Sequence, residues 1–123
     1  MHNEKYKKEP LVTGNYYHIY NRGNNGQDIF FDTGNYNYFL KLYQQYIYPI
    51  AETYAWCLIK NHFHLLVYLR SENEILKDFL EYSTIYSPKT LEPSKQFGHL
   101  FNAYTQAINK RYSRTGVLFE KPF

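Results

Sequence analysis

The sequence contains one cysteine, Cys57, and has little charge of one sign in excess. A single cysteine excludes a disulfide framework and a zinc site made of cysteines. The formal net charge of +3 permits a nucleic-acid partner without requiring one, because a strong electrostatic footprint for nucleic acid is more basic. No apolar run is long enough to span a bilayer, and the polar start of the chain is unlike a signal peptide. We therefore expect a cytoplasmic protein that makes no use of a membrane.

The sequence does contain enough apolar material for one core. The chain has 123 residues, of which 44% are hydrophobic, and this suits one ordinary domain. Residues 1–12 are polar and basic, and we interpret them as a flexible arm in front of a domain over 13–123. The 15 tyrosines and 9 phenylalanines can stack on nucleic-acid bases, but aromatic rings also fill cores.

Alternating and helical hydrophobic patterns predict the order of the elements. Strands are expected over 15–21, 52–59 and 62–69, with another strand beginning at 117–119. Only Lys60 and Asn61 separate the second and third strands, which predicts a tight hairpin. Helices are expected from 32 or 33 to about 48, behind a capping-box pattern at 71–74, and from about 94 to 114, where Gly116 closes the last helix. The β-α-β-β-α-α-β order predicts an α+β fold, ferredoxin-like or palm-like, with helices packed on an antiparallel sheet.

The residues most suited to chemistry lie in the run 61–67, Asn-His-Phe-His-Leu-Leu-Val. In a strand, residues two apart point to the same face, so His62 and His64 project side by side while Phe63 faces the core. Two neighbouring imidazoles can hold one metal ion, and two protein ligands leave positions open for a substrate oxygen. The same pair could instead line a solvent-facing sheet surface and bind nothing.

Other polar residues could extend this site. His18, on the first strand, would join or flank the histidine pair if their faces coincide, or it is an ordinary hydrogen-bonded residue of the sheet. Lys110, Arg111 and Arg114 cluster at the end of the last helix, where they complement the helix dipole or contact phosphates. Arg22, in a glycine-bearing loop, is a further candidate for phosphate contact, or it braces the loop. The four basic residues are the candidate DNA-binding residues.

Three blocks of the sequence resemble the single-tyrosine HUH transposases, and among these the REP-associated tyrosine transposases. The blocks are 17–23 (Tyr-His-Ile-Tyr-Asn-Arg-Gly), 55–65 (Ala-Trp-Cys-Leu-Ile-Lys-Asn-His-Phe-His-Leu) and 109–119 (Asn-Lys-Arg-Tyr-Ser-Arg-Thr-Gly-Val-Leu-Phe). They occur in the family's order, and the resemblance covers the chain from about residue 14 onward. Together they are far more specific than the histidine pair alone.

The resemblance implies a metal-dependent enzyme that nicks single-stranded DNA and transfers the cut strand. Its implied cofactor is a divalent ion, magnesium or manganese, held by His62 and His64. A helical tyrosine would attack a phosphodiester in single-stranded or hairpin DNA, forming a 5′-phosphotyrosine link and freeing a 3′-hydroxyl. Relatives act as monomers or as dimers, so a homodimer is one of the two states expected.

The nucleophile is where the sequence departs from the family pattern. The family's tyrosine lies on a helix after the region that corresponds to 118–123, and this chain ends at Phe123. We therefore expect the domain to lack its C-terminal nucleophile helix, together with a third metal ligand, and to be inactive by itself. Tyr104 and Tyr112 are the candidate nucleophiles within the chain, but both lie on the apolar stripe of their helix, which favours core packing.

Two other functions stay open at this point. The domain could be a non-catalytic nucleic-acid-binding relic or a repurposed module, which would bind hairpins in a salt-dependent way without cutting them. It could also be a different metal-dependent hydrolase of phosphate esters that uses the histidine pair. No carboxylate cluster accompanies His62 and His64 in the sequence, which counts against this last function.

Overall fold

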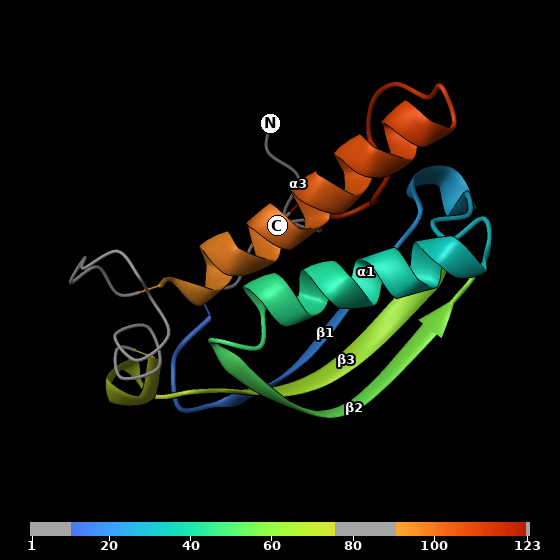
Figure 1. The fold of residues 1–123 in the computed structure, drawn as a ribbon. Helices are drawn as coiled ribbons and strands as arrows, with labels where there is room; N and C mark the ends of the chain where they lie inside the picture. Colours follow the sequence, from blue (N-terminus) through green and yellow to red (C-terminus); the bar gives the residue numbers. More distant parts are fainter. Residues whose placement is uncertain (1–10, 76–90, 123) are drawn as a thin grey trace, which may run out of the picture.

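The computed structural model describes residues 11–75 and 91–122, and Figure 1 shows how they are arranged. The elements are β1 (Tyr16–Arg22), a short 3-10 turn η2 (Asn24–Gly26), α1 (Thr33–Tyr46), β2 (Ala51–Ile59), β3 (His62–Leu69) and α3 (Pro93–Arg111). Helical residues 72–75 begin the helix predicted behind the capping box, and Ser71 and Glu74 exchange the two hydrogen bonds of that box. The rest of this helix, most of the loop predicted behind it and the arm up to residue 10 lie outside the described residues.

The three strands form one antiparallel sheet in the order β1-β3-β2. The predicted hairpin between β2 and β3 is confirmed, and it turns at Lys60 and Asn61. Along the central strand β3, every second side chain is buried, beginning with Phe63 and Leu65. One face of the sheet therefore enters the core, and the other face stays open.

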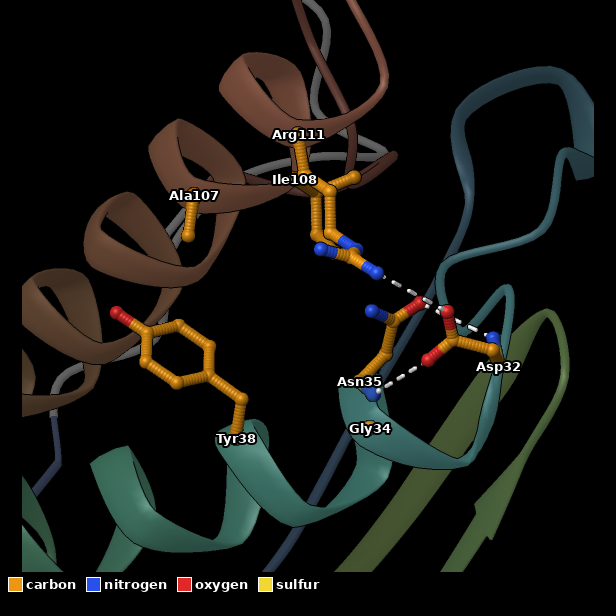
Figure 2. A pocket seen from close by; sticks show the side chains of 7 residues that line it. All are labelled: Asp32, Gly34, Asn35, Tyr38, Ala107, Ile108 and Arg111. Carbon is orange, nitrogen blue, oxygen red and sulfur yellow. Dashed lines mark hydrogen bonds and ion pairs between the residues drawn. The ribbon is translucent and has the colours of Figure 1, made fainter.

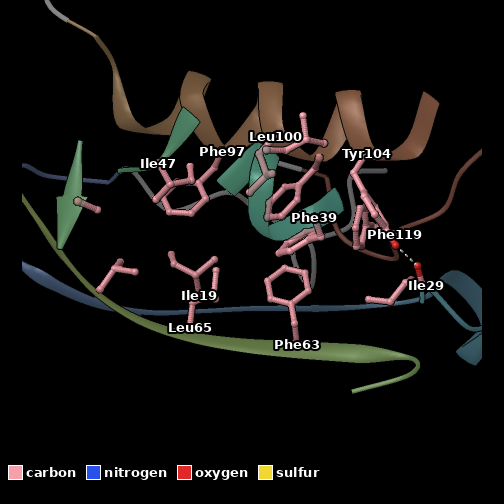
Figure 3. Packing of buried hydrophobic residues seen from close by; sticks show 14 of the residues in the cluster. Ile19, Ile29, Phe39, Ile47, Phe63, Leu65, Phe97, Leu100, Tyr104 and Phe119 are labelled. Atoms are coloured by element: carbon pink, nitrogen blue, oxygen red, sulfur yellow. Dashed lines mark hydrogen bonds between the residues drawn. The ribbon is translucent and has the colours of Figure 1, made fainter. Parts of the chain in front are cut away.

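The core lies between the buried face of the sheet and two helices. Figure 1 shows α1 and α3 side by side on this one face of the sheet. Figure 3 shows side chains of the helices, among them Phe97 and Leu100, pointing toward the strands. Phe39 of α1, together with Phe97 and Leu100 of α3, packs in one cluster with Phe63 and Leu65 of β3, and each of the five is at most 2% exposed. The predicted α+β architecture is confirmed. In the described part of the chain, no helix is long and apolar enough to cross a membrane.

The start of α1 follows from a local signal. The Asp32 carboxylate accepts a hydrogen bond from the backbone N–H of Asn35 at 3.1 Å, and the Asn35 side-chain oxygen accepts one from the backbone of Asp32 at 3.2 Å. This reciprocal pair satisfies two N–H groups that have no partner within the helix. The predicted start at Asp32 or Thr33 is confirmed, and the helix ends at Tyr46, two residues before the predicted end.

The end of α3 differs from the prediction. The helix stops at Arg111 instead of Arg114, Tyr112 is its C-cap, and Ser113 behind the cap adopts the left-handed conformation with φ of +52°. The backbone N–H of Arg114 then donates to the carbonyl of Asn109 at 2.8 Å, which is the long bond of a Schellman cap. Gly116 is also left-handed, but it lies in the loop beyond, so the prediction that Gly116 closes the helix was wrong.

The predicted last strand over 117–119 is reduced to one antiparallel bridge between Gly23 and Phe119. The bridge places this segment beside β1, at the position that the fourth strand takes in a ferredoxin-like sheet. Next to the bridge, the buried side chain of Asn21 takes over the pairing. Its amide donates to the carbonyl of Lys121 at 2.9 Å and accepts from the N–H of Lys121 at 3.1 Å. Because a side chain replaces a backbone partner here, the ladder does not continue.

Candidate functional site

The open face of the sheet carries the predicted histidine pair. On β3, His62 and His64 are half-buried and lie on the face opposite to Phe63 and Leu65. The centroids of the two imidazole rings are 5.3 Å apart, and the ring planes are nearly perpendicular at 85°. The prediction that the two rings project side by side from one strand is confirmed. Their role as metal ligands stays a prediction.

Both histidines use the same ring nitrogen for a hydrogen bond. The Nδ1 atom of His62 lies 2.9 Å from the side-chain oxygen of Asn61, and the Nδ1 atom of His64 lies 2.8 Å from the Nε2 atom of His18. Within the described residues, no hydrogen bond reaches the Nε2 atom of either His62 or His64. The two Nε2 atoms are therefore the nitrogens left available to a ligand.

The surroundings of His64 favour the neutral ring. Burial lowers the pKa of His64, and positive charge on His18 and His62 lowers it further. A neutral imidazole is the form that donates a lone pair to a metal ion. Among residues 11–75 and 91–122, no group of three or more His, Cys, Asp or Glu side chains is arranged to hold a metal. The described residues therefore offer a metal ion two imidazoles, those of His62 and His64.

Sequence reasoning missed two residues that border the pair, Tyr20 and Lys121. Tyr20 is the Cα partner of His64 on β1, and the two ring centroids are 5.9 Å apart. The Lys121 ammonium lies 3.7 Å from the centroid of the Tyr20 ring, a cation–π contact. The backbone of Lys121 is bonded to the Asn21 side chain of β1, a contact that has no signal in the sequence.

More tyrosines continue the open face toward the far end of the strands. The ring of Tyr16 lies 5.0 Å from that of Tyr68 and 5.6 Å from that of Tyr54, between ring centroids. Hydrogen bonds with Tyr16 and Glu52 raise the pKa of Tyr54 to about 12, so its hydroxyl is neutral. Tyr16 and Tyr54 are more than half exposed, and exposed rings of this kind can stack on bases of a single strand.

Arg22 is the one candidate DNA-binding residue that lies next to the histidines. It is the Cα partner of His62 on β1, and its side chain is 59% exposed. Its guanidinium donates two hydrogen bonds to the carboxylate of Glu120, at 2.7 and 2.8 Å. This bidentate pair ties the C-terminal segment to β1, so the bracing role considered for Arg22 is the one that the contacts display.

The other candidate DNA-binding residues lie at the end of the helix layer. The Arg114 guanidinium donates to the side-chain oxygen of Asn109 at 2.6 Å and to that of Gln27 at 2.5 Å, so it joins its own loop to α3 and to the loop at Gln27. Lys110 is exposed. Arg111 borders a hollow of about 390 Å³ between α1 and α3, with its guanidinium 3.9 Å from the carboxylate of Asp32 (Figure 2). The structure does not bring these residues together with the histidine pair, because the helices cover the opposite face of the sheet.

The two candidate nucleophiles also belong to the helix layer. Tyr104 is 0% exposed, and its hydroxyl donates to the carbonyl of Ile29 at 2.5 Å (Figure 3). Burial raises the pKa of Tyr104 well above its usual range, which disfavours the tyrosinate that a nucleophile needs. The Tyr112 hydroxyl donates to the carboxylate of Asp32 at 2.8 Å. Both contacts account for these tyrosines as parts of the fold.

No family model, no curated protein and no solved structure matches this chain. What the site can bind therefore follows from its own geometry. That geometry is two imidazoles with open Nε2 atoms, on an exposed sheet face bordered by one ammonium and several aromatic rings. Such a surface can hold a divalent ion beside an extended, negatively charged polymer.

Proposed function

We propose that this chain is the metal-binding domain of an enzyme that cuts and rejoins single-stranded DNA, of the kind that its sequence blocks resemble. The observation that carries the proposal is the matched bonding of His62 and His64. Each ring has its Nδ1 atom in a hydrogen bond, and within the described residues each Nε2 atom is left without one. Histidines that bind metals commonly use their second nitrogen in this way, because that bond fixes the tautomer and the ring orientation.

The donor set suits one divalent ion. Ring centroids 5.3 Å apart allow two imidazoles to share an ion at the bond length of about 2.0–2.2 Å that is usual for imidazole nitrogen. Of the two ions expected from the resemblance, manganese fits better, because magnesium prefers oxygen ligands. When bound here, the ion would polarise the phosphodiester and offset the negative charge of the transition state.

The chain's own residues would position the DNA. The Lys121 ammonium above Tyr20 lies where it can contact a phosphate near His64. It has three N–H donors for the phosphate oxygens. The exposed rings of Tyr16 and Tyr54 continue from there along the sheet and can hold unpaired bases by stacking. The exposed rings favour an extended single strand over a duplex, because the bases of a duplex already stack on each other.

The nucleophile in this proposal is a tyrosine on a segment beyond Phe123, as the resemblance implies. Its phenolate oxygen would attack the phosphorus, the bond from phosphorus to the 3′ oxygen would break, and the leaving oxygen would take up a proton. Tyr104 and Tyr112 do not serve this role, since both hydroxyls are bonded within the helix layer. We place the enzyme in the cytoplasm, where Cys57 stays reduced.

The experiment compares this chain with a form extended past Phe123, each incubated with a hairpin oligonucleotide and manganese. We expect a covalent protein–DNA adduct on a denaturing gel for the extended form alone. His62→Ala and His64→Ala in the extended form should abolish the adduct, whereas Lys110→Ala should leave it unchanged. An adduct formed by the 123-residue chain, or its persistence in both histidine variants, would contradict the proposal.

A second function, binding of single-stranded nucleic acid without cutting, is favoured by the exposed tyrosines of the open face. Stacking on these rings requires neither a metal nor a nucleophile. In that case the extended form would bind hairpins with an affinity that falls as salt rises, and no adduct would form with any metal.

A further inference from the structure

The register of the sheet brings a third histidine to the site. His18 lies on β1 two residues before Tyr20, which is the Cα partner of His64. The side chains of His18 and His64 therefore share the open face of the sheet. The Nε2 atom of His18 is 2.8 Å from the Nδ1 atom of His64. The ring centroids are 5.0 Å apart and the ring planes differ by only 15°. That centroid separation is close to the sum of the nitrogen–nitrogen distance and two ring radii, so the bond lies nearly in the plane of both rings.

One proton must lie between these two nitrogens, because a neutral imidazole has one N–H donor and one acceptor. If His64 donates from Nδ1, its Nε2 atom has a free lone pair. If His18 donates instead, the proton of His64 is on Nε2, and that nitrogen cannot bind an ion. The direction of this single bond therefore decides whether His64 can be a ligand.

We propose that His18 is a positioning residue that accepts the hydrogen bond from His64 Nδ1 and so presents the Nε2 lone pair of His64 to a divalent cation. This inference rests on the function proposed above. His18 would do for His64 what Asn61 does for His62, whose Nδ1 atom lies 2.9 Å from the Asn61 side-chain oxygen. Each ligand then has one acceptor behind it: one from the hairpin turn and one from the neighbouring strand.

The first test measures manganese affinity by calorimetry, with the 123-residue chain carrying Cys57→Ser so that no thiol contributes. His18→Phe keeps a ring beside Tyr20 but removes the acceptor, and we expect it to weaken binding about 10–100-fold with the stoichiometry unchanged. His18→Gln keeps a side-chain acceptor and should restore part of the loss. Tyr68→Phe, on the same face and the same strand as the pair, is the matched control and should bind as the parent does.

Two results in this assay would overturn the proposal. Equal affinity in the parent and His18→Phe would show that His18 does not position His64. A loss as complete as that of His64→Ala, without rescue by glutamine, would make His18 a direct ligand. If the parent bound no manganese at all, the metal site of the proposed function would fail together with this inference.

A second readout separates the two failures because it uses no metal. Nitrogen-15 NMR of the imidazoles at about pH 8, where histidine is neutral, reports which nitrogen of His64 has the proton. We expect the proton on Nδ1 in the parent, and a mixture of tautomers in His18→Phe. A proton on Nε2 of His64 in the parent would overturn the role of His18, whatever metal the chain binds.

Discussion

The substitution Tyr104→Phe separates a structural tyrosine from a catalytic one. The change removes a single oxygen from a side chain that is 0% exposed and retains its ring. The ring keeps its perpendicular contact with Phe39, at 5.2 Å between centroids, and its contact with Phe30 at 5.6 Å. What is lost is the hydrogen bond to the carbonyl of Ile29.

The loss should be measurable as stability. Leaving a buried acceptor without its partner costs about 1–3 kcal/mol. With a urea dependence of about 2 kcal/mol per molar, a value usual for small proteins, a cost of about 2 kcal/mol lowers the unfolding midpoint by about 1 M. The slope of the transition should not change, because the same surface is exposed on unfolding.

Urea unfolding followed by circular dichroism is the assay, and Tyr38→Phe is the control. Tyr38 is 39% exposed and its ring also contacts Tyr104, but within the described residues no hydrogen bond reaches its hydroxyl. We expect its midpoint to move by less than the equivalent of about 0.5 kcal/mol. A midpoint for Tyr104→Phe equal to that of the parent would refute the reasoning about the buried bond. Manganese affinity should be unchanged in both variants.

Three further predictions concern the loops and the helix start. Arg114→Ala should lose about 2 kcal/mol in urea unfolding, because it removes two charge-assisted bonds, one to Asn109 of α3 and one to Gln27. Lys110→Ala should change stability by less than about 0.5 kcal/mol, and equal values would contradict the bracing role. Asn21→Ala should lower the Tm by several degrees, because the backbone of Lys121 loses both bonds to the buried amide, and an unchanged melt would contradict this. The hydrogen bond from Tyr112 holds the pKa of Asp32 below its ordinary value of 3.8. The stability that this bond contributes is therefore fully present above about pH 4 and is lost as the pH falls through the lower pKa of the folded state. The Tm deficit of Tyr112→Phe should therefore shrink between about pH 7 and about pH 2, and a constant deficit would contradict the assignment.

The parts of the fold that sequence predicts correctly depend on neighbours in the chain. The hairpin at Lys60 and Asn61 follows from the two alternating runs on either side of it, and the start of α1 follows from Asp32 acting within one turn. The end of α3 was placed too late because glycine is the usual left-handed residue, and Ser113 adopts that conformation instead. The last strand was overestimated because its backbone pairing is confined to a few bonds with residues 22–24. At Lys121 the buried side chain of Asn21 replaces a backbone partner, which a hydrophobic pattern does not reveal.

The candidate site likewise has one part that the sequence predicts and another part that depends on tertiary contacts. The shared face of His62 and His64 is a consequence of strand period alone, so the sequence predicts it. The hydrogen bond between His18 and His64 depends on the register between β1 and β3, and the position of Lys121 depends on a tertiary contact. The DNA contact of the charge cluster at 110–114 stays a prediction, and the structure adds the partners of its guanidiniums, which are Asp32 for Arg111, and Asn109 and Gln27 for Arg114.

In the proposed function, the Nε2 atoms of His62 and His64 hold one divalent ion. Pulsed EPR of the chain loaded with one equivalent of manganese measures this most directly, because nitrogen-14 nuclei bonded to the ion modulate the echo. We predict couplings from two imidazole nitrogens in the parent and from one in either His62→Ala or His64→Ala. A spectrum with no nitrogen coupling, or one that is the same in the parent and both variants, would contradict the claim.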